Sequence, residues 1–157
     1  MNSLGMANSG GSSVELALVA VAAAVAKANE HGLKVSVAMV DQGGHLVAFA
    51  RVEGTPWHSI DLAIDKARTS ASFGLPSSTL GEMLDHACER VRMNLMMRPE
   101  IVALGGALPV RNDGQLLGAL GVSGASEEQD TLCAVAGCDA LAEKINQYST
   151  EDKIHVG

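Results

Sequence analysis

The sequence predicts an α+β fold in which an antiparallel sheet of about five strands carries helices packed on it. Two segments, residues 35–51 and 108–124, place apolar residues on both sides of a turn built from Asp, Asn and Gly. This pattern is the strongest short-range signal for an antiparallel hairpin. Segments with helical spacing of apolar residues precede, separate and follow the two hairpins. Hairpins that alternate with helices are typical of an antiparallel sheet with helices on its faces.

The first helix is expected to begin at residues 12–15 (SSVE), which have the form of a capping box, and to run to about His31. Gly32 is suited to end it. Residues 14–28 are apolar nearly all round, and a helix without a polar face must be covered on both sides. We therefore expect the sheet on one side of this helix and a partner subunit on the other.

Two helices are expected between the hairpins. Ser59 is predicted to cap the first of them, which should end near Ser72 because Gly74 follows. Residues 79–82 (TLGE) form a second capping box, and apolar residues keep helical spacing from there to about Met97. The sequence thus predicts one continuous helix over this stretch.

The chain after this helix is expected to complete the sheet. Residues 101–104 suit a short fifth strand ahead of the second hairpin. Ser126 is predicted to cap a last helix over residues 127 to about 147, with acidic residues in its first turn, where the helix dipole favours them.

Length and composition indicate one domain. The chain has 157 residues, enough to bury a sizeable core. We assign residues 12–148 to this domain, residues 1–11 to a flexible leader and residues 149–157 to a polar tail. Hydrophobic residues make up 47% of the chain but aromatic residues only 3%, so the core must consist mainly of Ala, Val, Leu and Met.

Charge and motif content exclude several classes of function. The net charge is -7 and no basic run is present, which argues against nucleic-acid binding. No apolar run is long enough to span a membrane, and no phosphate-binding loop, dinucleotide-binding or zincin motif occurs. Three unpaired cysteines without a signal peptide suit a cytoplasmic location, and Cys133 and Cys138 are expected to be small buried hydrophobes.

The first hairpin supplies the side chains best suited to chemistry. His45 follows Gly43-Gly44, and strict alternation would place it on one face with the other odd residues, Val47, Phe49 and Arg51. An imidazole and a guanidinium on one face can hold an anionic ligand, or can mark a solvated sheet edge. Asp41 is expected to stabilise the turn through its side chain.

The helix after this hairpin carries two further candidates. Lys66 has apolar neighbours, and a partly buried lysine would gain nucleophilic or base character. Arg68 is interpreted as a solvated charge. His58, beside Trp57 in a loop, is the histidine that we expect to be able to reach His45.

The end of the second hairpin has two interpretations. Ser123-Gly124 forms an amide-rich turn just before a helix, and such a turn can receive a carboxylate. Alternatively, its small residues serve only to pack the strand end closely on the helix. Asp130, in the first turn of that helix, is expected to complement the helix dipole.

Five fragments occur in order along the chain: residues 40–51 (VDQGGHLVAFAR), 66–71 (KARTSA), 105–109 (GGALP), 118–124 (GALGVSG) and 129–130 (QD). Through them the chain, from about residue 14 to 145, resembles the GlcG-like (HbpS-like) family, which is also related to the C-terminal domain of PduO-type proteins. The chain departs from the family pattern at residues 105–109, which have one residue more than the usual Gly-Gly-x-Pro. It departs again at Val52-Glu53, where Met-Asp is common.

The resemblance implies a profilin-like domain that assembles into dimers or octamers. It marks eight residues around a ligand pocket: Asp41, His45, Arg51, Lys66, Thr69, Ser123, Gly124 and Asp130. Because some members of the family bind haem, it implies haem as the cofactor, with His45 or His58 as donor to the iron.

Two other hypotheses remain open. The chain can be a hydrolase, deaminase or tautomerase acting on a small acidic intermediate of a catabolic pathway. Arg51 and the amides of Ser123-Gly124 would then hold a carboxylate, while His45 or Lys66 transfers protons. It can also be an assembly subunit without a ligand, in which the glycines serve packing alone.

Overall fold

The computed structural model describes residues 13–154, in which helices alternate with two hairpins as the sequence predicts. The leader, Ser12 of the expected capping box and residues 155–157 lie outside the described residues. The elements are α1 (Ser13–Glu30), β1 (Ser36–Asp41), β2 (Leu46–Arg51), α2 (His58–Phe73), α3 (Ser77–Asp85), α4 (Glu89–Met96), β3 (Ala107–Asn112), β4 (Gln115–Ser123) and α5 (Glu127–Ile154).

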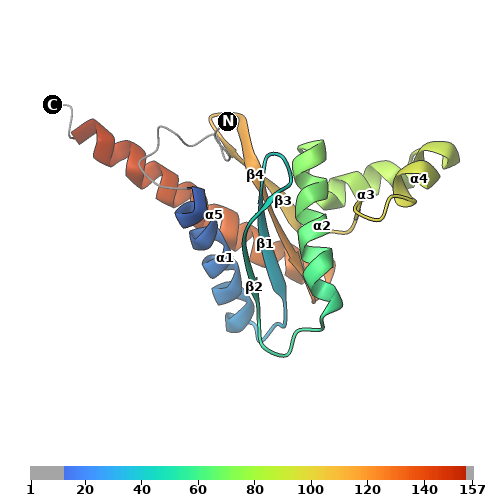
Figure 1. Ribbon diagram of the computed structural model, residues 1–157, viewed down its shortest axis with the longest axis horizontal. Helices are drawn as coiled ribbons and strands as arrows, with labels where there is room; N and C mark the ends of the chain where they lie inside the picture. Colours follow the sequence, from blue (N-terminus) through green and yellow to red (C-terminus); the bar gives the residue numbers. More distant parts are fainter. Residues whose placement is uncertain (1–12, 155–157) are drawn as a thin grey trace.

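A four-stranded antiparallel sheet in the order β2-β1-β4-β3 separates two layers of helices (Figure 1). Helices α1 and α5 pack against each other and cover one face, and α2 covers the other. The central strand β1 serves both layers, because its side chains alternate. Met39 joins the core of α1 and α5, whereas Val40 packs with Ala67 and Ala71 of α2.

The predicted α+β class is confirmed, but the sheet has four strands among the described residues, not about five. The expected strand at residues 101–104 does not form. The side chain of Thr69 takes the place of a strand partner there. Its hydroxyl donates to the Glu100 carbonyl at 3.2 Å and accepts from the Val102 amide at 3.0 Å. The Val102 amide is thus bonded to a helix side chain and not to a strand neighbour.

The single helix expected from residue 79 to about 97 is two helices, α3 and α4. The chain tightens after α3, where the Ala87 amide donates to the Leu84 carbonyl, and Cys88 then adopts an extended conformation. A further expectation that fails concerns Ser59, which lies inside α2 and does not cap it. Its hydroxyl donates to the Pro56 carbonyl. The last helix also runs further than predicted, to Ile154.

The ends of the first and last helices follow the expected signals. Gly32 has a φ of 65° just after α1. Ser126 caps α5, because its hydroxyl accepts a hydrogen bond from the Gln129 amide at 3.2 Å and the Gln129 side chain accepts one from the Ser126 amide. Cys133 is buried, and burial raises the pKa of the Cys138 thiol to about 12. Cys133 is therefore buried as expected, whereas Cys138 is partly buried and packs against the same core.

A β-bulge changes the faces predicted for β2. Ala48 pairs with Met39, but the register shifts at the next pair, so that Leu46 stands opposite Val40. Val47 is the extra residue, and it packs against the same core as Ala48. The alternation expected from His45 to the end of the strand is therefore broken, as a bulge requires.

The described residues cover only one side of helix α1. It buries Leu16, Ala20 and Ala24 against α5 and the sheet, whereas Val14 and Leu18 are about half exposed, at 50% and 52%. In the described part of the chain, no helix combines the length and apolar character needed to cross a bilayer.

Candidate functional site

The turn between β1 and β2 is held by one carboxylate. Asp41 is 8% exposed, and its Oδ1 accepts hydrogen bonds from the backbone amides of Gly43 and His45, each at 2.9 Å. This is the turn-stabilising role expected for Asp41 from the sequence. Gly44 has a φ of 84°, which glycine adopts without steric cost. The sequence D-Q-G-G-H thus folds into a turn around the Asp41 side chain.

The same carboxylate orients the imidazole of His45. The Nδ1 atom of His45 lies 3.2 Å from Asp41 Oδ1, while the His45 side chain is 82% exposed. Its Nε2 atom makes no hydrogen bond within the described residues and faces solvent. A carboxylate on one ring nitrogen with the other nitrogen free is the usual arrangement of a histidine that binds a metal centre.

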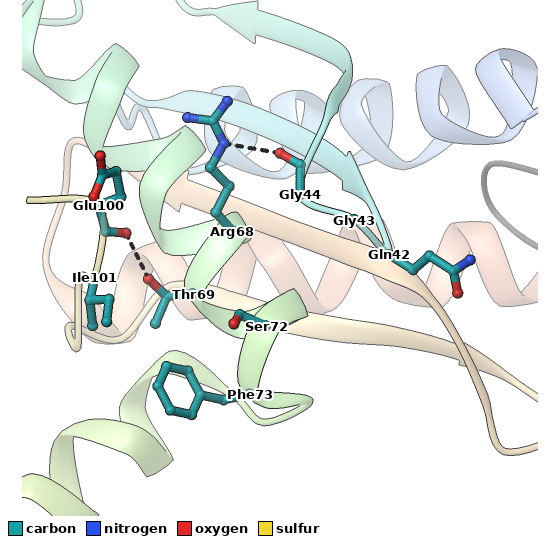
Figure 2. A pocket seen from close by; sticks show the side chains of 9 residues that line it. All are labelled: Gln42, Gly43, Gly44, Arg68, Thr69, Ser72, Phe73, Glu100 and Ile101. Atoms are coloured by element: carbon teal, nitrogen blue, oxygen red, sulfur yellow. Dashed lines mark hydrogen bonds between the residues drawn. The ribbon is translucent and has the colours of Figure 1, made fainter. Parts of the chain in front are cut away.

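A pocket of about 310 Å³ opens beside this turn, between the turn, α2 and the segment after α4 (Figure 2). Nine residues line it: Gln42, Gly43, Gly44, Arg68, Thr69, Ser72, Phe73, Glu100 and Ile101. His45 is not among them, but it directly follows Gly44 in the chain. A Cβ atom added at Gly43 would lie 3.0 Å from His45 Nδ1, so the imidazole rests against a residue of the pocket wall.

Arg68 supplies the positive charge of the pocket. Its Nε donates to the Gly44 carbonyl at 3.0 Å, as Figure 2 shows, and its side chain is 45% exposed. Asp65 lies 3.6 Å from Arg68 Nη1, and burial raises the pKa of that carboxyl above its ordinary value. Phe73 and Ile101 add apolar surface. Glu100 also lines the pocket, which therefore combines apolar surface with one cationic and one anionic side chain.

Lys66 does not reach this pocket, because it belongs to a buried ion pair. Its Nζ lies 3.0 Å from Asp130 Oδ2 and donates to the Val122 carbonyl at 3.1 Å. The two side chains are 3% and 2% exposed. Burial raises the pKa of Asp130, and this effect is larger than the lowering effect of Lys66. The pair ties α2 to the start of α5 across the edge of the sheet.

The amide-rich turn at Ser123-Gly124 is also used internally. The next amide, that of Ala125, donates to Asp130 Oδ1 at 3.0 Å. A Cβ atom added at Gly124 would collide with the Lys34 carbonyl. Of the two interpretations of this turn, the geometry favours close packing of the strand end.

The eight residues marked by the resemblance therefore separate into three places. Asp41, His45 and Thr69 lie at the turn and pocket. Lys66, Ser123, Gly124 and Asp130 lie around the buried ion pair. Arg51 lies at the far end of β2, in the same row of the sheet as Ser123, because both stand opposite Ser36. Arg51 is about 20 Å along the strand from His45, at about 3.3 Å a residue. There its Nη1 donates to the Thr55 carbonyl. The catalytic set of His45, Lys66 and Arg51 is thus not assembled.

His58 also lies apart from His45. It begins α2, ten residues before Arg68, which corresponds to about 15 Å along a helix. Its ring packs edge-on against Trp57 with 6.5 Å between centroids. The expectation that His58 reaches His45 is not met. Within the described residues, no group of three or more His, Cys, Asp and Glu side chains could hold a metal ion.

Sequence reasoning missed most of the pocket wall. Arg68 was expected to be merely solvated, and Ser72, Phe73, Glu100 and Ile101 were not considered. One signal was present. Arg68 and Ser72 are four residues apart, as are Thr69 and Phe73, so all four share one side of α2. The contribution of Glu100 and Ile101 depends on the tertiary fold.

Comparisons with known proteins agree on one family. The family model described as "Haem degrading protein HbpS-like" matches residues 13–139. Protein GlcG of Escherichia coli K12 is 33% identical over 111 residues, which cover 71% of this chain and 80% of that protein. A double mutant of Streptomyces reticuli HbpS has a TM-score of 0.76 at 35% identity, covering 82% of this chain and 86% of the other. The complex of PduOC with heme has a TM-score of 0.74 at 27% identity, covering 80% and 91%.

Proposed function

Because the chain belongs to the HbpS-like family, we propose that it binds haem at the turn between β1 and β2, with His45 as the donor to the iron. The observation that carries this proposal is the contact between Asp41 and His45. Asp41 occupies Nδ1 of the imidazole at 3.2 Å and leaves Nε2 directed to solvent beside a pocket. A relative of known structure is a complex with heme, which supports the same ligand.

The residues around His45 fit the chemical groups of haem. The exposed part of the Arg68 guanidinium can pair with a propionate, and guanidinium and carboxylate groups match in geometry. Phe73 and Ile101 offer apolar surface to the edge of the macrocycle. The pocket volume of about 310 Å³ lies at the lower end of the range for small-molecule sites. The pocket would therefore enclose only part of the ligand, and His45 would supply the donor to the iron.

Bound haem would supply an iron centre with redox and ligand-binding chemistry. The part of the protein is to hold the imidazole. Asp41 fixes the ring in the tautomer that carries its proton on Nδ1, which keeps the Nε2 lone pair available. It also ties the ring to the turn through the amides of Gly43 and His45. Loss of Asp41 should weaken haem binding about 10- to 100-fold, the usual effect of removing such a partner.

A hemin titration followed by the Soret absorption band tests the proposal. The unaltered protein should give a saturable shift of the band, His45→Ala should abolish it, and Asp41→Ala should weaken it. His58→Ala is the matched control, because it removes another exposed imidazole and lies about 15 Å along α2 from Arg68. The proposal is wrong if the unaltered protein gives no saturable shift, or if His45→Ala binds as well as His58→Ala.

We also propose that the chain self-associates through the outer side of α1. Val14 and Leu18 are about half exposed there, one turn apart on a helix whose residues 16–26 are all apolar. Burying them against a second copy would supply the cover that the described residues lack. Sedimentation velocity should show a species heavier than one chain, and Leu18→Glu should lower its mass.

A further inference from the structure

Helix α4 projects from the body of the molecule and buries none of its residues. Figure 1 shows α4 beyond α3, at the end furthest from the sheet. We call residues 86–98 the α4 arm. Met93, Met96 and Met97 of the arm are 51%, 65% and 77% exposed, and no residue of α4 is buried. Large apolar side chains gathered in water without a partner are unfavourable, so the arm has the character of a contact surface.

The arm is also basic, although the chain as a whole is acidic. It carries Arg90, Arg92 and Arg98 against the single acidic residue Glu89, while the net charge of the chain is -7. None of these three arginines forms an ion pair within the described residues. Methionine and arginine are the non-aromatic residues most enriched where proteins meet.

An acidic groove lies on the same molecule. It has a volume of about 650 Å³ and runs between α3, residues 103–105 and the start of α5. Four carboxylates line it, those of Glu82, Asp85, Glu127 and Glu128, and no Lys or Arg does. Its apolar part includes Leu104, which is 48% exposed.

We propose that the α4 arm of one copy docks in this acidic groove of a second copy. The arginines of the arm would meet the carboxylates of the groove, and its methionines would cover Leu104. The arm does not occupy the groove of its own chain, because it leads outward from α3 (Figure 1). Opposite charges on the two surfaces favour this pairing and disfavour a contact between two arms or two grooves.

A two-fold arrangement suits these surfaces. Helix α4 has eight residues and is about 12 Å long. One such contact is too small for a stable interface, which usually buries about 800 Å² on each partner. If each copy places its arm in the groove of the other, the contact area doubles and the assembly closes. This inference does not rest on haem binding, because the arm and the groove are separate from the pocket beside His45.

Charge reversal on each surface, followed by mixing, tests the pairing by sedimentation velocity. The arm variant is Arg90→Glu with Arg92→Glu, and the groove variant is Glu82→Arg with Glu128→Arg. The described structure gives none of the four side chains an ion pair, so both variants should fold. Each variant alone should have a lower mass than the unaltered protein. An equimolar mixture should regain the heavier species, because a reversed arm fits a reversed groove.

Two controls separate this pairing from a general effect of charge. Glu53→Arg with Glu143→Arg changes the net charge as the groove variant does but lies outside the groove, and it should keep the unaltered mass. Met96→Ser with Met97→Ser changes no charge and should lower the mass, which keeps the test valid if a reversed variant does not fold. The inference is overturned if the unaltered protein is a single chain, if the folded variants keep its mass, or if a mixture of two folded variants does not recover it.

Discussion

The hairpin of β3 and β4 closes through its backbone, whereas the hairpin of β1 and β2 closes through a side chain. In the former, Asn112 pairs with Gln115 across a two-residue turn, with Asp113 and Gly114 at φ values of 49° and 79°. Positive φ at both positions matches the twist of the strands. In the latter, four residues separate the strands, and the carboxylate of Asp41 takes two of their amides. A carboxylate that closes a turn is also placed to orient an imidazole.

The strands of the two hairpins also differ in how deeply they are buried. Most of β4 is buried, and its glycines let neighbouring backbone approach closely, as at Gly121 beneath α2. Strand β2 is an edge strand with exposed residues at both ends. The glycines of the second hairpin thus serve packing, whereas those of the first leave room beside a polar side chain. Substitutions should therefore be far more disruptive in the second hairpin.

The largest effect is expected for Gly121→Val. A Cβ atom at this position would collide with the Ala63 carbonyl and lie 2.7 Å from the Ala67 amide nitrogen. Both atoms belong to the backbone of α2 and cannot move aside. We expect the free energy of unfolding to fall by more than about 4 kcal/mol, which is a large part of the stability of an ordinary domain. Circular dichroism should show no cooperative thermal transition; a melting temperature close to that of the unaltered protein would contradict the comparison.

Lys66→Met should have the next largest effect, because Lys66 binds both the end of β4 and Asp130. The substitution leaves a carboxylate buried without its partner, which costs about 3–5 kcal/mol. Urea unfolding measures this loss. Lys27→Met is the matched control, since its ion pair with Glu30 is at the surface and should contribute less than about 1 kcal/mol. Equal losses in the two variants would show that the buried pair is not what holds this end of the sheet.

The same ion pair predicts a dependence of stability on pH. Burial raises the pKa of Asp130 in the folded protein above its value in the unfolded chain. Between these two values the folded protein binds more protons, so the contribution of this group to stability falls as the pH rises. Below the unfolded value the contribution is complete. Unfolding by urea over this range should show a smaller fall in Asp130→Asn than in the unaltered protein, because Asp65, whose pKa burial also raises, contributes in both.

The sequence predicted those features of the fold that depend on neighbours in the chain. The two hairpins, the helix end at Gly32 and the cap at Ser126 follow from local residues and are all present. The fifth strand was predicted wrongly because the hydroxyl of Thr69, from a helix about thirty residues earlier, satisfies that segment. The bulge at Val47 was missed because nothing in a run of apolar residues marks the extra one.

The residues of the candidate site also divide into those that follow from local sequence and those that depend on distant partners. Asp41 and His45 were predicted because four residues separate them and a turn joins them. Arg68 was taken as a solvated charge, since its bond to the Gly44 carbonyl links residues 24 positions apart. Lys66 was expected to be partly buried, and it is, but its partner Asp130 lies 64 residues away. Partners that far apart in sequence are fixed by the packing of helices on the sheet, which residue patterns do not reveal.

Gly43→Ala is expected to have the smallest effect on stability and provides the sharpest test of the first hairpin. A Cβ atom here would lie 3.0 Å from His45 Nδ1 and 3.4 Å from Asp41 Oδ1. The exposed imidazole can move aside, so the free energy of unfolding should change by less than about 0.5 kcal/mol. The same movement weakens the contact with Asp41, so the hemin titration should show reduced affinity. Unchanged affinity would mean that the position of the His45 ring is not what the ligand requires, whereas a large loss of stability would place this turn with the packed glycines of β4.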